Sequence, residues 1–417
     1  MFLKIVRKQF LEYLLSLRFL VGTLLCLAVG VGATWVRSDA YRTALGDYRM
    51  NRSIHGTEAK GYTQPYPLTY DGVSVDKKPT MLGTFYRGLE PARPLSVRVT
   101  GNRDPMAEDQ YEQSNLISDL FQTVDLMSFA ALVMSLLALV FSYDTISGEK
   151  ESGTLRVMLS FPVPRDALLL GKWIGGFAAV AVPFILTCLC SLGVAVVHPG
   201  MEITTRDLAA FGLLVLSALL CTGSFYSLGL LVSTLTSRAF TSIAVLVAIW
   251  VALTVALPNL SPYIARALVP VPTVQAVERE KWAASQAANA ERGQRIRDYR
   301  QNTSDDEAQQ AVVISELFRD CFTDIARGHE QIQAEYERTL DRQVFAAVWL
   351  SRIAPSASLV YAAGEVADTG IREWRRFRKA VHKYRVAFLN YCEDKWIERA
   401  RQDFKPITTK DYPRFHY

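Results

Sequence analysis

The sequence predicts an all-α, polytopic membrane protein with sizeable parts outside the membrane. Of its 417 residues, 50% are hydrophobic, a share that soluble domains also reach, so the clustering of charges decides the class. Charged side chains are almost absent from five apolar windows and dense elsewhere, which is the pattern of membrane-spanning helices. The net charge of +5 is modest, and the basic residues are mixed with almost as many acids. Nucleic acid is therefore not an expected partner.

The five apolar windows are long enough to cross about 30 Å of hydrocarbon. Before them, residues 1–18 combine four basic side chains with apolar residues at helical spacing, which predicts an amphipathic helix at the membrane surface. A cleaved signal peptide is the rival interpretation, but no A-x-A-like site follows the first window. The expected spans are residues 19–35, 124–142, 173–197, 208–235 and 240–257.

Basic residues in short loops predict the orientation. The N-terminal segment and the loop at 143–172 each carry four, and the turn at 236–239 carries Arg238. These three parts, with the N-terminus, are expected on the cytoplasmic side. Residues 36–123 and 258–417 are then extracytoplasmic, and they are too long for the charge rule to apply to them.

The two extracytoplasmic parts are expected to differ. The first is predicted to be mixed α/β, with helices at 37–50 and 108–123 and a strand-like SVRVT at 96–100. The second is predicted to be mainly helical, because apolar and aromatic side chains recur there at helical spacing. Antiparallel packing would bury these stripes, and a solvated helical hairpin is the alternative. The helices expected in this second part are residues 274–300, residues 305–319 and onward, residues 330–350 and residues 372–401.

Several kinds of chemistry are missing from the sequence. Gly171-Lys172 is followed by Trp173, so the chain has no P-loop for ATP. The five histidines are scattered singly, which indicates neither a metal centre nor an acid–base cluster. An enzyme is therefore not expected, and no cofactor is expected in this chain. Cys321 and Cys392 could form a disulfide outside the cell, but two cysteines do not fix a pairing.

The middles of the spans lack acids and bases, which argues against a carrier driven by protons or sodium. The fourth span is instead rich in small and hydroxylated residues. Such residues most often serve helix packing in lipid; the alternative is a substrate path or a dimer seam. The residues considered for that alternative are Ser217, Thr222, Ser224, Tyr226 and Ser227.

The loop at 143–172 is the most informative stretch. It begins with helix-starting side chains, Gly148 and Gly153 permit a break, and Pro162 and Pro164 end the short helix. An apolar patch with charges beside it would suit docking into a groove of another protein; a loop resting on lipid headgroups is the alternative. The patch is Leu155, Met158 and Leu159, and the charges are Glu149, Lys150, Glu151 and Arg156.

The stretch FSYDTISGEKESGTLRVMLSFPVPRDALLLGKWIG at 141–175 resembles the loop after the second span of ABC-2-type ABC transporter permeases. An E…E.GTL..LLS.P.SR..ll.GK pattern recurs in that family, and here Pro164 replaces the usual Ser or Thr. APSA at 354–357 and ADTG at 367–370 are similar to the branch with large extracytoplasmic domains, the copper-enzyme-maturation or gliding-type permeases. The matching residues are Glu149, Glu151, Gly153, Thr154, Leu155, Ser160, Pro162, Arg165, Gly171 and Lys172.

The resemblance implies the permease (transmembrane) subunit of an ATP-driven transporter in the bacterial inner membrane. A separate ABC ATPase subunit would hold ATP and Mg, and a second permease subunit, identical or different, would complete the pair. The family has six spans, so a sixth is expected after Tyr417. The alternative is a non-transporting relay that passes ATPase-driven motion to an extracytoplasmic protein. The expected ATPase contacts are Thr145, Glu149, Lys150, Glu151, Gly153, Thr154, Leu155, Arg156, Met158 and Leu159.

Overall fold

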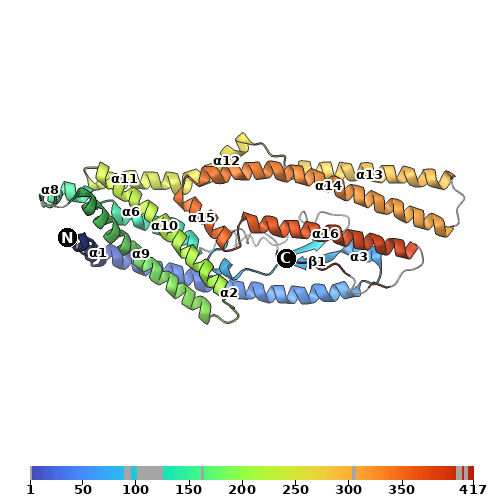
Figure 1. Ribbon diagram of the computed structural model, residues 1–417, viewed down its shortest axis with the longest axis horizontal. Coiled ribbons are helices and arrows are strands. Elements are labelled where there is room, and N and C mark those ends of the chain that lie inside the picture. Colours follow the sequence, from blue (N-terminus) through green and yellow to red (C-terminus); the bar gives the residue numbers. More distant parts are fainter. Residues whose placement is uncertain are drawn as a thin grey trace.

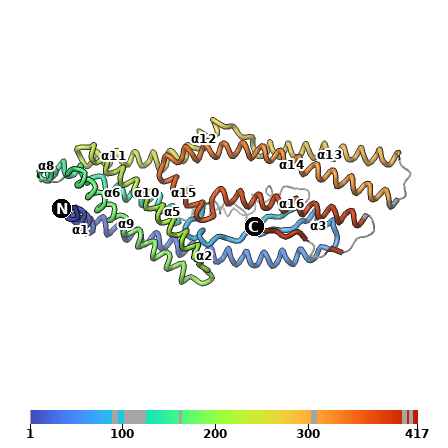
Figure 2. The backbone as a smooth tube through the Cα atoms, viewed as in Figure 1, coloured from blue at the N-terminus to red at the C-terminus, as the bar shows by residue number. Residues whose placement is uncertain are grey.

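The computed structural model is an elongated molecule with a helical bundle at one end and a mostly helical extension at the other (Figures 1 and 2). Within the described residues, five helices are long and apolar enough to cross a membrane. This confirms the predicted all-α, polytopic membrane class and the five spans predicted before Tyr417. The described residues are 2–88, 95–100, 125–160, 164–302, 307–400, 406–407 and 412–417.

The N-terminal segment forms a helix of its own ahead of the first long apolar helix. Helix α1, Phe2–Leu14, packs along α9, Arg165–Val197. Ser16 then caps α2, Leu17–Gly61, by accepting a hydrogen bond from the Phe19 amide. The 45 residues of α2 continue far beyond the expected span at 19–35, so one helix joins the bundle to the extension (Figure 1).

The other spans contain two π-helical segments. The second span is α5, η3 and α6, and Asp125 starts it by accepting a hydrogen bond from the Ser128 amide at 2.7 Å. The fifth span continues through η4 into α12, so that the apolar helix is 30 residues long. The elements are α5 Leu126–Phe129, η3 Ala130–Met134, α6 Ser135–Ser142, α10 Thr205–Leu235, α11 Ala239–Trp250, η4 Val251–Ala256 and α12 Leu257–Leu268.

The first part of the extension contains the predicted mixture of helix and strand. Strand β1, Val73–Asp76, pairs antiparallel with β2, Ser96–Val99. Val97 and Val99 are fully buried, because alternate residues of β2 face the core. Helix α3, Pro65–Asp71, and the 3₁₀ turn η1, Met81–Thr84, complete this part. The helix predicted at 108–123 lies outside the described residues.

The second part of the extension is helical, as expected, but one boundary was wrong. The helices predicted at 305–319 and 330–350 form a single helix, α14, because the intervening stretch contains Gly328 but no proline. One glycine costs a helix only about 1 kcal/mol. Cys321 and Cys392 are both free thiols. The helices are α13 Val274–Asn302, α14 Glu307–Ser351, α15 Pro355–Val366 and α16 Ile371–Ala400.

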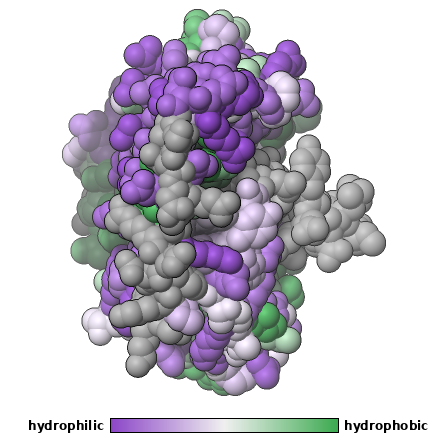
Figure 3. Space-filling view, turned by 90° about the vertical axis from the view of Figure 1, so that its right-hand side faces the viewer, coloured by the Kyte–Doolittle hydropathy of each residue, from purple (hydrophilic) through white to green (hydrophobic). Residues whose placement is uncertain are grey.

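Two hydrophobic cores hold the molecule together. The larger core fills the bundle and includes Leu359 and Ala363 of α15, which packs on α10 and seats the extension on the bundle. The smaller core joins the strands to α16 through Phe377 and Phe388. The far end of the extension is mostly hydrophilic in the end-on view (Figure 3).

Candidate functional site

The predicted loop lies at the end of the bundle opposite the extension (Figure 1). The chain turns after α6 into α7, Ser147–Glu151, and then into α8, Thr154–Leu159. Gly153 separates the two short helices in a left-handed conformation with φ of +77°, which glycine adopts without steric cost. The predicted break is therefore at Gly153, whereas Gly148 lies inside α7.

An ion pair between a half-buried carboxylate and a buried ammonium fastens α7 to the bundle. Glu149 Oε2 lies 2.5 Å from Lys172 Nζ, and the same ammonium donates a hydrogen bond to the Thr145 carbonyl at 2.8 Å. Lys172 is only 2% exposed, and removing a charge from water is costly unless it is paired. Glu149 was expected to be an exposed docking charge, and in the structure it serves as an internal partner instead.

Lys150 and Glu151 hold the turn between α10 and α11. Lys150 Nζ donates to the carbonyls of Thr234 and Thr236, the latter at 3.0 Å. Glu151 Oε2 accepts a hydrogen bond from the Ala239 amide at 3.0 Å. A cation thus meets the negative end of α10 and a carboxylate meets the positive end of α11, which is the favourable arrangement for both helix dipoles.

Hydroxyl groups add hydrogen bonds between uncharged groups next to these ionic contacts. Ser233 Oγ of α10 accepts hydrogen bonds from the Ile146 and Ser147 amides, each at 3.0 Å. Thr145 Oγ1 shares a hydrogen bond of 2.8 Å with the Tyr13 hydroxyl of α1. Thr145 is buried, so its contacts lie within this chain.

Arg18 of α2 completes the attachment. Its guanidinium donates to Asp144 at 2.8 Å and to the Tyr143 hydroxyl at 3.0 Å, and it lies over the Tyr143 ring. We call residues 143–151 the loop base. It contacts α1, α2, α9, α10 and the start of α11, so a displacement of the base acts on several helices together.

The loop tip, residues 153–159, is exposed. No residue of α8 is buried; Val157 is 62% and Leu159 42% exposed, and Arg156 is also exposed. Leu155 and Met158 are half-buried. The sequence reasoning missed Val157, because its position falls off the predicted patch and only the way α8 stands away from the bundle leaves it exposed.

The hydroxylated residues of α10 are divided between buried and exposed sides of the helix. Thr222 is buried and Ser224 exposed, and both donate to carbonyls of their own helix, as Ser217 does. Ser227 accepts a hydrogen bond from the Trp173 indole at 2.9 Å. Tyr226 is fully buried in the bundle core. These contacts fit helix packing, the commoner role of such residues.

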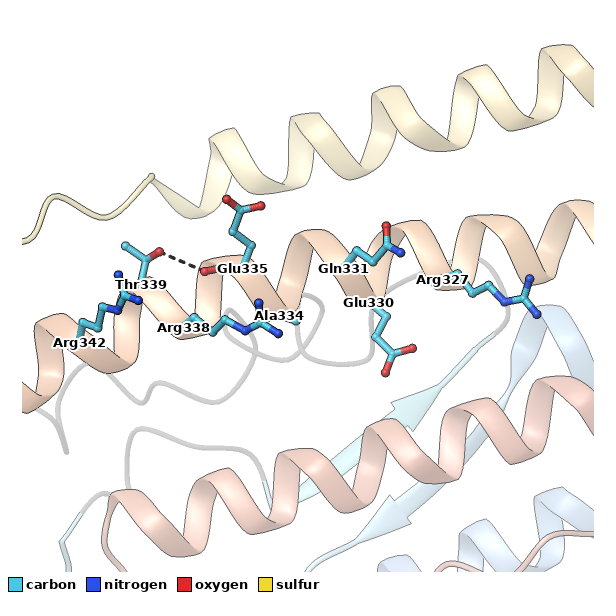
Figure 4. Close-up of a pocket in the computed structure, with 8 residues that line it drawn as sticks. All are labelled: Arg327, Glu330, Gln331, Ala334, Glu335, Arg338, Thr339 and Arg342. Carbon is cyan, nitrogen blue, oxygen red and sulfur yellow. Dashed lines mark hydrogen bonds between the residues drawn. The ribbon is translucent and has the colours of Figure 1, made fainter.

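A separate groove of about 670 Å³ runs along α14 in the extension (Figure 4). Its charges are mixed: Glu330 and Glu335 lie between Arg327 and the pair Arg338 and Arg342 along α14. Among the described residues, no group of three or more His, Cys, Asp or Glu side chains is placed to hold a metal ion.

Comparison with known proteins matches the chain to one family. The family model described as ABC-2 family transporter protein matches residues 3–282. A probable ABC transporter permease protein NosY of Stutzerimonas stutzeri is 38% identical over 79 residues, 19% of this chain and 29% of that protein. The protein of the same name from Pseudomonas aeruginosa is 33% identical over 126 residues, 30% of this chain and 46% of that protein. The chain thus spans less than half the length of either relative.

Proposed function

The chain belongs to the ABC-2 family of transporter proteins, and we propose that it is the permease subunit that couples ATP hydrolysis on a separate ATPase to substrate movement across the membrane. The main support for this proposal is the difference between the exposed tip and the attached base of the 143–172 loop. Its tip stands free at the end of the bundle, whereas its base is fastened to five helices. A surface that receives force needs both properties: access for a partner and rigid attachment to what must move.

In this proposal the ATPase binds the tip at the cytoplasmic face of a bacterial inner membrane. Val157 and Leu159 enter an apolar groove of the ATPase, and Arg156 lies at its rim. Movement of the tip passes through α7 to Lys172 of α9 and to the α10–α11 turn. ATP and Mg belong to the ATPase, and a second permease subunit, identical or different, completes the pair.

Co-purification with the cognate ATPase tests this assignment. Val157→Asp places a charge on the tip and should reduce the amount of bound ATPase. Val274→Asp is the matched control, because Val274 is 57% exposed at the start of α13 in the extension, and it should leave binding unchanged. Equal binding by both variants would remove the tip from the ATPase interface.

A second candidate function, the relay to an extracytoplasmic partner, is favoured by one observation. Helix α2 runs without interruption from the bundle into the extension, so it connects the two parts directly. For a relay, spin labels on α2 and on α14 should change their separation when ATP binds to the ATPase complex, with no substrate present. A fixed separation would exclude the relay and leave the transport proposal standing.

A further inference from the structure

Helices α12 and α14 lie side by side where the bundle meets the extension. The Gln343 side chain donates to the Val269 carbonyl at 2.8 Å, and α14 runs back toward the bundle, antiparallel to α12 (Figure 1). Both helices carry small buried residues here, Ser261 and Ala265 on α12 and Ser351 on α14. This register places residues 345–353, the end of α14 and the turn after it, level with about residues 259–267 of α12.

Large apolar side chains are exposed in this band. Tyr263 is 74% and Leu268 68% exposed on α12, and Phe345 and Trp349 are 65% and 56% exposed on α14. Phe345 and Trp349 lie four residues apart on α14 and therefore share one face. Ile353, in the turn after α14, is 66% exposed. We call residues 259–268 and 345–353 together the outer shelf. Exposed apolar and aromatic groups gathered at one level indicate an interaction surface.

The lengths of two spans place the outer shelf relative to a bilayer. On α2 the uncharged run lies between Arg18 and Arg37, a rise of about 29 Å, which matches about 30 Å of hydrocarbon. On α11–α12 the uncharged run lies between Arg238 and Arg266, a rise of about 42 Å. This length matches a bilayer together with its headgroups, which is about 40–45 Å thick. Both helices run along the long axis (Figure 1). The part of the α11–α12 run that is longer than the α2 run, which belongs to α12, therefore lies at headgroup depth.

We propose that the outer shelf binds the headgroup region of the outer leaflet. Tyr and Trp rings are favoured at this depth, because one part of each ring is apolar and the other forms hydrogen bonds. Arg352 lies over the Trp349 ring, 5.8 Å from its centroid, and can meet lipid phosphates. Helix α14 belongs to the extension and crosses no membrane, yet it rests on the bilayer and fixes how the extension stands. The inference depends on the spans, not on coupling to an ATPase.

Fluorescence quenching by spin-labelled lipids tests the shelf. Cys190 is the one exposed cysteine of the six, so Cys190→Ser provides a background in which Trp349→Cys can be labelled with an environment-sensitive dye. The full chain is reconstituted in phosphatidylcholine vesicles that carry the nitroxide on the headgroup or at carbon 12 of the acyl chain. The matched control is Asp324→Cys, exposed on the same helix and about 38 Å farther out.

The dye at position 349 should lose fluorescence strongly with the headgroup nitroxide, weakly with the acyl-chain nitroxide, and the dye at 324 with neither. Equal, weak quenching at 349 and 324 would overturn the proposal. Disulfide formation between Trp349→Cys copies, together with protection from the headgroup nitroxide, would also overturn it and assign the shelf to a second copy of the chain.

Discussion

The ion pair between Glu149 and Lys172 allows the loop base to be tested by mutation. Glu149→Gln leaves the Lys172 ammonium, 3% exposed in its side chain, with only the Thr145 carbonyl and a neutral amide. An unpaired buried charge costs about 3–5 kcal/mol, and the remaining carbonyl argues for the lower end, about 3 kcal/mol. Lys172→Met leaves Glu149 instead, whose side chain is 24% exposed and can be hydrated. The expected loss is then smaller, about 1–2 kcal/mol.

Reversible unfolding in mixed micelles, followed by tryptophan fluorescence, measures these losses. The double variant Glu149→Gln/Lys172→Met should be no less stable than Lys172→Met alone, because the unpaired ammonium is gone. The matched control is the exposed pair Glu291–Arg295, 2.6 Å apart, where loss of either partner should cost under about 1 kcal/mol. Equal and additive losses for Glu149 and Lys172 would show that the pair is not desolvated and that the loop base is held in another way.

Three further predictions concern other parts of the molecule. Gly153→Ala should lower the unfolding free energy by about 1 kcal/mol and reduce ATPase stimulation by more than Gly153→Asn does. An added Cβ at this position meets no neighbouring atom, so the expected cause is strain in the left-handed backbone. Equal effects of the two variants would refute that cause. Gly229→Ala should cost about 1–3 kcal/mol, because the added methyl group would overlap the Ser142 side chain where α6 meets α10; an unchanged thermal midpoint would contradict this close approach. Burial raises the pKa of Glu393 from 4.5 to about 7. Between these two pH values the folded state binds more protons than the unfolded state, so the melting temperature should fall as the pH rises from 5 to 8. Glu393→Gln should abolish this decrease, and a wild-type melting temperature that rises over the interval would contradict the raised pKa.

The spans could be predicted from sequence because each depends on a local property, an uncharged apolar run long enough for the bilayer. One strand of the sheet, β2, was readable for a similar reason, since SVRVT alternates along a short β-branched stretch, whereas its partner β1 was not predicted. The boundary within α14 was misjudged because a single glycine weakens a helix without ending it. The length of α2 was underestimated because the sequence analysis ended the span where charges begin, although the helix itself continues.

The division of the loop into base and tip could not be read from the sequence. Glu149, Lys150 and Arg156 all carry charged side chains within eight residues, and the sequence does not distinguish their roles. Their different roles depend on Lys172 and on the carbonyls of Thr234 and Thr236, which are brought near only by the packing of the bundle. Sequence reasoning therefore located the loop and its break, while the fold decides which side chains remain available to a partner.

Site-specific photo-crosslinking tests the central claim, that the loop tip is where the ATPase binds. A photoreactive amino acid at Val157 is illuminated in membranes that contain the cognate ATPase, and the same amino acid at Val274 serves as the control. The account predicts a product of permease plus ATPase from position 157, with none from position 274. Crosslinking to the ATPase from 274 only, or absence of that product from 157 in membranes where the complex co-purifies, would contradict it.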